Sequence, residues 1–289
     1  MSPPTTRALL TIGTLLAFLP RLLSSAEIVT PPIPDTRVII SKAKPPEGMK
    51  VAAVEWITIT SPKHDVMLAA VAKPSGPGPF KTVVILHGSH GFASEYVQLA
   101  TALAEHGIQA IAACWFSGSS GGTGSRFVSP IACPEAAPIP VASSEQALAT
   151  IDTLIQAARQ LPGAANDQIA LFGHSRGGGA ALNYILKRSG IYAVALNSAG
   201  YPPEITAAAA RIQAPVLILH GTADGPLDGG SAMTSVVMAR DFEAAIRRAG
   251  KPLHTHYYDG AGHSGIFSSE IQRADSIQRI VQFLEQPVP

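Results

Sequence analysis

Residues 173–177 read Gly-His-Ser-Arg-Gly and place a serine between two glycines. The apolar run 168–172 before them predicts a buried strand, and residues 177–187 after them predict a helix. A Gly-x-Ser-x-Gly turn between a strand and a helix is typical of a nucleophile elbow, which presents a serine hydroxyl to a substrate carbonyl. Ser175 is therefore the candidate nucleophile.

A serine nucleophile needs a base, because its hydroxyl is barely ionised at neutral pH, and the base needs a carboxylate that fixes its tautomer. The sequence after Ser175 contains both in the order acid, then base. Asp224 follows the strand-like run 216–219, and His263 follows the strand-like run 253–258. We expect these three residues to form a catalytic triad that cleaves carboxylic esters through an acyl-enzyme intermediate.

Other polar residues near the predicted triad have alternative interpretations. Asp228 is a second candidate acid, because it could reach the imidazole if the turn after Asp224 folds back. His254 and His256 alternate on one strand, but no third ligand is spaced near them, so we predict neither a metal site nor another cofactor. Asp259 stands next to a glycine, which is typical of a carboxylate that stabilises its own turn.

Ester hydrolysis also needs two N–H groups that bind the oxyanion, one from the residue after the nucleophile and one from a loop after an early central strand. Arg176 supplies the first by its position. The segment His-Gly-Ser-His-Gly at residues 87–91 follows the strand-like run 82–86, and we expect the Ser89 N–H to be the second donor. For His87 we favour a role in loop hydrogen bonding over a catalytic role.

The substrate pocket is expected beside these residues. Residues 115–140 form a long irregular segment that either borders the acyl or alcohol pocket or is a surface loop. Its Ser/Gly-rich run 117–124 lacks the Lys-Ser/Thr pair of a phosphate-binding loop. Residues 197–214 are too few for a large lid, which predicts an open, shallow site. The candidate pocket residues are His90, Phe92, Trp115 and His174.

Alternating strand-like and helix-like segments position these residues. The alternation predicts an α/β fold with a mostly parallel central sheet covered by helices on both faces and with ligands at the carboxyl ends of its strands. Ser143 and Gln146 have the spacing of a helix-capping box. We expect strands at residues 54–59, 66–71, 82–86, 109–113, 168–172, 192–196, 216–219 and 253–258, the first two as an antiparallel hairpin, and helices at residues 95–105, 145–160, 177–187, 235–249 and 269–284.

Composition and the N-terminal residues indicate the domain organisation. With 289 residues, 46% of them hydrophobic and 14% charged, the chain can bury one large core. Residues 1–26 resemble a cleaved signal peptide, residues 27–50 a proline-rich lead-in without its own core, and residues 51–289 the catalytic domain. The apolar stretch 8–19 is shorter than the ~18 residues of a spanning helix, so we expect a secreted or periplasmic protein without stable membrane insertion.

The net charge and the two cysteines narrow the possible partners and the compartment. A formal net charge of +1 without a basic run is no reason to expect nucleic acid as a partner. In an oxidising compartment Cys114 and Cys133 can pair and tie down the loop between them. The alternative is a buried free Cys114 and an unrelated Cys133, because sequence spacing does not define geometry.

Four motifs together carry a family resemblance: Leu-His-Gly at residues 86–88, Phe-Gly-His-Ser-Arg-Gly-Gly at 172–178, Leu-His-Gly-Thr-Ala-Asp at 219–224 and Gly-His at 262–263. From about residue 51 onward the chain resembles the dienelactone-hydrolase-like branch of the α/β-hydrolase superfamily. The resemblance implies a sheet of about eight strands, the triad above and hydrolysis without a cofactor. Dienelactone hydrolases carry a cysteine at the elbow, so Ser175 indicates ordinary carboxylic esters. The elbow is also similar to those of chlorophyllases and bacterial polyester hydrolases.

Two other functions remain as alternatives. A peptidase of the prolyl-oligopeptidase kind uses the same triad, and a comparison of amide with ester turnover distinguishes it from an esterase. A catalytically silent binding protein with a hydrolase fold is less expected, because such a protein need not keep nucleophile, base and acid together. Failure of a fluorophosphonate probe to label Ser175 would favour that second alternative.

Overall fold

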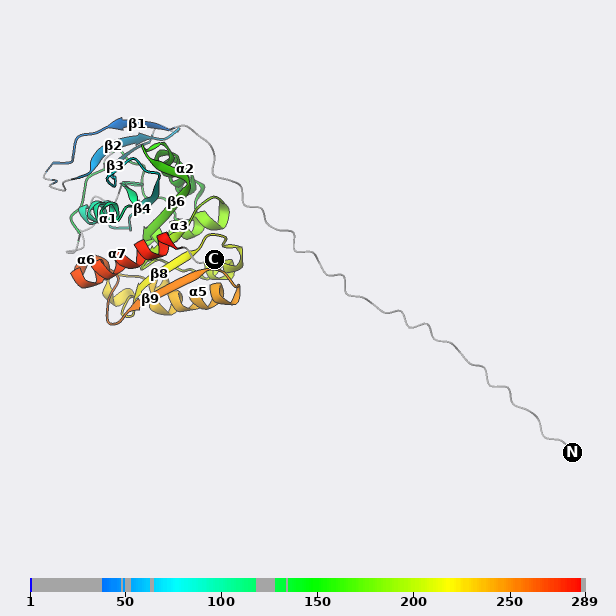
Figure 1. The fold of residues 1–289 in the computed structure, drawn as a ribbon. Coiled ribbons are helices and arrows are strands. Elements are labelled where there is room, and N and C mark those ends of the chain that lie inside the picture. Colours follow the sequence, from blue (N-terminus) through cyan, green and yellow to red (C-terminus); the bar gives the residue numbers. More distant parts are fainter. Residues whose placement is uncertain are drawn as a thin grey trace.

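The computed structural model describes residues 38–47, 53–62, 65–117, 128–133 and 135–286, together with Met1 and Met49. These residues form a nine-stranded sheet with the order β1-β2-β3-β5-β4-β6-β7-β8-β9 (Figure 1). The pairs β1–β2, β2–β3 and β3–β5 are antiparallel, and all other neighbouring strands are parallel. The strands are β1 (Ile39–Lys42), β2 (Glu55–Thr60), β3 (Val66–Ala72), β4 (Phe80–Leu86), β5 (Gln109–Ala113), β6 (Ala164–His174), β7 (Val194–Asn197), β8 (Val216–Gly221) and β9 (Leu253–Tyr258).

Helices cover both faces of this sheet, so its central strands are buried on both sides. In β4, Val84 and Leu86 belong to the core on one face, whereas Val83 and Ile85 belong to the core on the other. The first core also contains side chains of α2, α3 and α5, and the second contains side chains of α1 and α7. The helices are α1 (Ser94–Glu105), α2 (Glu145–Gln160), α3 (Arg176–Lys187), α4 (Pro203–Ala207), α5 (Val236–Arg248), α6 (Gly265–Ser268) and α7 (Glu270–Glu285), with short 3₁₀ turns η1 (Ala209–Arg211), η2 (Pro226–Asp228) and η3 (Ala232–Thr234).

The architecture confirms the predicted α/β fold with a mostly parallel sheet and helices on both faces. Three details differ. Strand β1 lies within the expected lead-in and pairs with β2 at the sheet edge, so the sheet begins earlier and has nine strands rather than about eight. The N-cap of α2 is Ser144, whose side chain accepts a hydrogen bond from the Ala147 N–H at 3.2 Å, and not its neighbour Ser143. The short elements α4, α6 and η1 to η3 lack the length that produces a periodic pattern.

The connection between β7 and β8 contains α4 and η1 and no larger helical insertion, in line with the predicted absence of a large lid. Cys114 and Cys133 form a disulfide, with their Cα atoms 6.3 Å apart, which joins the end of β5 to the segment before α2. The expected signal peptide and most of the Ser/Gly-rich run 117–124 lie outside the described residues. Within the described part of the chain, every helix is too short or too polar to cross a membrane.

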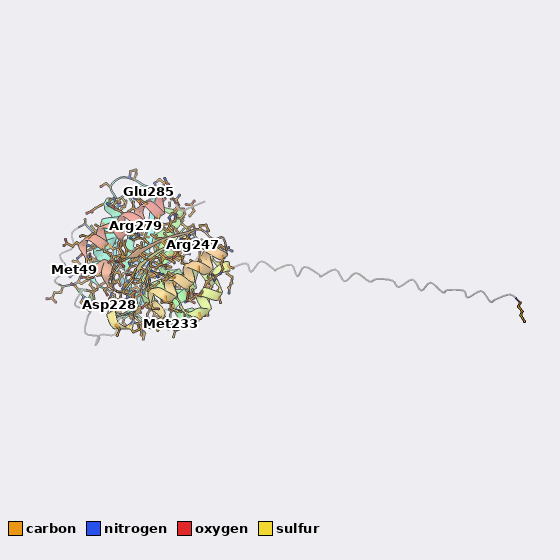
Figure 2. All side chains as sticks on the ribbon, turned by 90° about the horizontal axis from the view of Figure 1, so that it is seen from below. Met49, Asp228, Met233, Arg247, Arg279 and Glu285 are labelled. Atoms are coloured by element: carbon orange, nitrogen blue, oxygen red, sulfur yellow. A yellow bond between two sulfur atoms is a disulfide. The ribbon has the colours of Figure 1, made fainter. Side chains whose placement is uncertain are left out.

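The parallel strands bring the candidate site together. Strands β4, β6, β8 and β9 all run in the same direction, and their carboxyl ends therefore lie at one edge of the sheet. The loops that begin at this edge contain the predicted donor, nucleophile, acid and base. Figure 2 shows Asp228 and Met233, both from the loop after β8, close together on the surface of the domain.

Candidate active site

Ser175 occupies the sharp turn between β6 and α3. Its backbone has φ 53° and ψ −118°, a left-handed φ that a residue with a side chain rarely adopts. Two backbone hydrogen bonds hold this conformation: the Ser175 N–H donates to the Asn197 carbonyl at 3.0 Å, and the Gly179 N–H donates to the Ser175 carbonyl at 3.1 Å. The turn therefore presents the hydroxyl in a conformation that the neighbouring strand and helix impose.

The glycines on either side of the serine allow this close packing. A Cβ atom on Gly173 would lie 2.5 Å from backbone atoms of Gly177. A Cβ atom on Gly177 would overlap the Leu86 carbonyl group at the end of β4. Both positions need glycine because strand β6, the elbow and strand β4 are in direct contact there.

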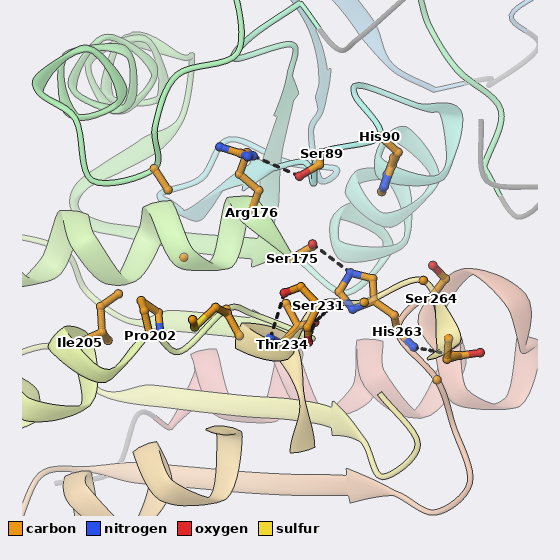
Figure 3. Close-up of a pocket in the computed structure, with 18 of the residues that line it drawn as sticks. Ser89, His90, Ser175, Arg176, Pro202, Ile205, Ser231, Thr234, His263 and Ser264 are labelled. Atoms are coloured by element: carbon orange, nitrogen blue, oxygen red, sulfur yellow. Dashed lines mark hydrogen bonds between the residues drawn. The ribbon is translucent and has the colours of Figure 1, made fainter. Parts of the chain in front are cut away.

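The structure brings Ser175, His263 and Asp224 into contact, and Figure 3 shows the hydrogen bond between Ser175 and His263. The Ser175 Oγ lies 2.9 Å from His263 Nε2, and both Asp224 carboxylate oxygens lie 3.0 Å from His263 Nδ1. Because a carboxylate only accepts, Nδ1 donates to Asp224, and in the neutral ring Nε2 then accepts the serine proton. This is the arrangement that a general base and its orienting acid require.

Asp228 has a different position. The turn after Asp224 does fold back, as the Asp228 N–H donates to the Gly225 carbonyl at 3.0 Å. However, the Asp228 carboxylate accepts from the main-chain N–H of His263 at 2.7 Å and not from its imidazole. Asp224 therefore orients the ring, and Asp228 holds the backbone of the same residue.

A second buried histidine supports the acid. His220 Nε2 lies 2.8 Å from the Thr234 carbonyl oxygen and 3.3 Å from Asp224 Oδ2, and since both partners only accept, Nε2 carries a proton. Burial lowers the pKa of His220, which favours the neutral ring. The Thr234 hydroxyl donates to Asp224 Oδ1 at 3.3 Å. Our sequence reasoning missed His220, although its position at the end of a strand, four residues before Asp224, could have indicated it.

The predicted oxyanion donors come from two segments, the start of α3 and the loop after β4. Arg176 is the first residue of α3, where a backbone N–H has no partner within its own helix. In the loop after β4, the Gly88 N–H already donates to the Tyr96 hydroxyl at 3.0 Å, which leaves Ser89 as the next donor. The Arg176 side chain joins the two sites, because its Nε donates to Ser89 Oγ at 3.1 Å (Figure 3). Its Nη1 donates to the Pro140 carbonyl at 2.9 Å. The sequence had shown only the backbone role of Arg176.

Three more histidines lie near Ser175 and His263, and burial favours the neutral form of each. The pKa of His87 falls to about 3, and its Nδ1 is hydrogen-bonded to the Gly88 carbonyl at 3.0 Å, in line with a role in loop hydrogen bonding. The pKa of His90 is lowered to about 4, mainly by burial and to a smaller extent by the nearby His263. Burial also lowers the pKa of His174 well below its usual range.

A cavity of about 960 Å³ opens at Ser175 and His263, and we call it the active-site cavity. His90 lines it, as predicted, but Phe92, Trp115 and His174 do not. These three side chains are at most 2% exposed and pack beneath the loop after β4. The Trp115 indole donates to the His87 carbonyl at 3.0 Å, and the His174 Nδ1 is hydrogen-bonded to the Asn197 side chain at 2.9 Å. They support the wall of the cavity instead of forming it, because their side chains are buried in the core.

The described residues contain no group of three or more His, Cys, Asp or Glu side chains that could hold a metal ion. His256 Nε2 instead lies 3.8 Å from Asp275, and the His254 ring packs against Phe283.

Comparison with known proteins decides the family. The sequence profile of the dienelactone hydrolase family matches residues 67–286. The chain belongs to this family. The dienelactone hydrolase match includes the elbow, the acid loop and the base, and begins within β3. Among curated proteins, none matches the chain.

Several solved structures share the fold. A Klebsiella pneumoniae protein assigned to the dienelactone hydrolases aligns with a TM-score of 0.64 and 21% identity over 87% of this chain and 100% of the other. A dienelactone hydrolase-like promiscuous phosphotriesterase from metagenomic libraries aligns with a TM-score of 0.61 and 17% identity over 80% of this chain and 97% of the other. Esterase 2 of Thermogutta terrifontis, phosphoramylated by tabun, aligns with a TM-score of 0.62 and 16% identity over 83% of this chain and 96% of the other. Membership of the dienelactone hydrolase family, together with these folds, supports a serine hydrolase that acts on carboxylic esters.

Proposed function

We propose that this protein hydrolyses carboxylic esters through an acyl-enzyme, with Ser175 as nucleophile, His263 as general base and Asp224 as the acid that orients it. The observation that carries the proposal is the unbroken contact from Ser175 Oγ to His263 Nε2 at 2.9 Å and from His263 Nδ1 to Asp224 at 3.0 Å. The family assignment supports the same reaction class.

In the first half of the proposed reaction, the Ser175 oxygen attacks the ester carbonyl carbon while His263 Nε2 takes the serine proton. The negative oxygen that results is stabilised by the backbone N–H groups of Ser89 and Arg176. Collapse of this intermediate breaks the bond to the alcohol oxygen, which leaves with the proton from His263. Water then attacks the acyl-serine by the same route, and the carboxylic acid is released.

The surroundings of His263 suit this proton transfer. During the reaction His263 becomes positively charged, and the Asp224 carboxylate is the charge in direct contact with it. The low pKa values of His90 and His174 keep both rings neutral at pH 7, so neither of these histidines places a positive charge beside the imidazolium. The site can therefore form an ion pair of Asp224 and His263 without competition from its other histidines.

The test is the Ser175→Ala variant, assayed with p-nitrophenyl acetate. Loss of a triad nucleophile typically lowers kcat by about 10⁴-fold or more, so turnover should fall to the background rate. A fluorophosphonate probe should label the wild type at Ser175 and leave the variant unlabelled. Ser235→Ala is the matched control, because Ser235 lies outside the active-site cavity and its side chain makes no capping hydrogen bond. Full turnover by a folded Ser175→Ala protein would refute the proposed nucleophile.

We also propose that residues 1–26 are a cleaved signal peptide and that the enzyme is secreted or periplasmic. The disulfide between Cys114 and Cys133 supports this location, because disulfides form and persist in oxidising compartments. Expression in a bacterial host with an export pathway, followed by N-terminal sequencing, should give a mature protein that begins at Glu27. An intact N-terminus on cytoplasmic protein would contradict the proposal.

A further inference from the structure

The active-site cavity does not end at the catalytic residues but continues as a groove along one face of α3. Arg176, Gly179 and Asn183 line it and are spaced three and four residues apart, so they lie on the same face of the helix. In Figure 3 the labelled side chains follow one another away from His263 in the order Thr234, Pro202 and Ile205. The groove thus begins at the nucleophile and extends for two turns of the helix.

Apolar and polar side chains together form the walls of this groove. Val141 stands on one side, and Pro202, Ile205, Leu227 and Met233 line it as well. Val141, Leu227 and Met233 are among the few large apolar side chains that the described residues leave exposed. Exposed apolar side chains that gather around a cavity typically mark a binding surface, because single ones are scattered on ordinary surfaces.

Charge in the groove does not favour an anionic ligand. Its ionisable groups besides the catalytic imidazole and His90 are Arg176, Glu204 and Asp228. The guanidinium of Arg176 already donates to Ser89 and to the Pro140 carbonyl. Two carboxylates against one engaged cation therefore favour an uncharged ligand over a carboxylate.

Gly179 forms the floor of the groove, and the fold does not require a glycine there. A Cβ atom at this position would meet only the Gly200 carbonyl oxygen at 3.8 Å, which is ordinary contact. At the adjacent Gly178, by contrast, a Cβ atom would lie 2.5 Å from the Ala199 Cβ. A glycine inside a helix costs about 0.5–1 kcal/mol relative to alanine, so Gly179 is the more costly residue for the helix and leaves the groove open.

We propose that this groove binds the unbranched apolar chain of the ester and that the missing side chain at Gly179 sets its depth. The proposal rests on the proposed function, because the groove serves the ester bond held at Ser175. The chain can belong to the acyl or to the alcohol part of the ester, and both present the same hydrocarbon to the walls. The substrate class is therefore esters with an extended hydrocarbon chain.

The test compares long with short chains in Gly179→Leu, with Gly179→Ala as its small counterpart. To test the acyl part of the ester, kcat/KM is measured with p-nitrophenyl octanoate and with p-nitrophenyl acetate. To test the alcohol part, kcat/KM is measured by pH-stat with octyl acetate and with ethyl acetate. Each methylene of the substrate that the groove buries adds a similar amount of binding free energy. Filling the groove should therefore lower the octanoate-to-acetate or the octyl-to-ethyl ratio of kcat/KM by about 30-fold. Gly179→Ala should change either ratio by less than about threefold.

Removal of the exposed walls is a second and independent test. The double variant Leu227→Ser, Met233→Ser changes side chains that are already exposed, so it should fold even if Gly179→Leu does not. It should lower the same ratio by about tenfold. Ile271→Ser is the matched control, because Ile271 is an exposed apolar residue of α7 outside the groove, and it should leave both ratios unchanged.

The outcomes separate this inference from the proposed function. A drop in one ratio supports the groove and shows which part of the ester it holds. If Gly179→Leu folds and both ratios are unchanged, the proposed role of the groove is refuted. If Gly179→Leu does not fold, unchanged ratios in the double variant refute it. In either case, ester turnover by the wild type leaves the proposed function intact. Absence of turnover with all four esters in the wild type overturns the proposed function and the groove that rests on it.

Discussion

Two loops face Ser175, and they are held in different ways. The loop after β4, residues 87–92, is supported from below by buried rings, among them Trp115 and Phe116, whose centroids lie 5.8 and 4.4 Å from that of His87. The loop after β8, residues 222–235, is held by polar contacts in which Asp224 and Asp228 accept hydrogen bonds from His263. The donor loop thus depends on apolar packing, and the acid loop depends on its carboxylates.

The largest effect is expected from the acid loop. In Asp224→Asn the amide can no longer hold the imidazole in the required tautomer or stabilise its positive charge, so kcat should fall by about 10⁴-fold. Asp228→Asn is the control, because its amide oxygen can still accept from the His263 N–H, and its kcat should stay within about tenfold of the wild type. Steady-state kinetics with p-nitrophenyl acetate measure both. If the two variants lost equal activity, the assignment of Asp224 as the orienting acid would be wrong.

The donor loop should respond to acid through its stability. The pKa of His87 is about 3 in the folded protein against 6.5 in a free histidine, so between these values the unfolded chain binds a proton that the folded one does not. The free energy of unfolding should therefore decrease as the pH falls, by about 2 kcal/mol from pH 7 to pH 5 for this histidine. Urea unfolding of the wild type and of His87→Gln at both pH values measures the contribution of His87 to the free energy of unfolding. If both proteins lost the same free energy of unfolding between pH 7 and pH 5, His87 would be excluded as the cause of the acid sensitivity.

The smallest effect is expected where the donor loop contacts the elbow. Ser89→Ala removes the acceptor of the Arg176 Nε–H but keeps the backbone N–H, so kcat should fall by about fivefold with little change in KM. Thr222→Ala is the matched control in the acid loop, since its hydroxyl donates to Asp259 and not to a catalytic residue. Its kcat should equal that of the wild type. A rise in KM for Ser89→Ala without a change in kcat would show that Ser89 contributes to binding alone.

The residues of the candidate site were predictable because each stands at a recognisable place. Ser175 lies between glycines at the end of an apolar run, and Asp224 and His263 each follow a strand. These signals are local in the sequence, and the parallel sheet brings the residues close together in space. The pocket residues were less predictable: Phe92, Trp115 and His174 lie at or shortly after the carboxyl end of a strand, but their side chains are buried in the core.

The sequence by itself determined the longer strands and helices, the family, the candidate nucleophile and base, and the loop that holds the candidate acids, because periodicity and glycine spacing are local properties of the chain. Only the tertiary structure shows that Asp224 contacts the imidazole of His263 and Asp228 its main chain, since both lie in one loop and the contacts depend on how its turn folds. The same holds for the open floor at Gly179: a glycine that packing requires and one that leaves space look alike in a sequence. Their difference is the distance to a neighbour on another segment of the chain.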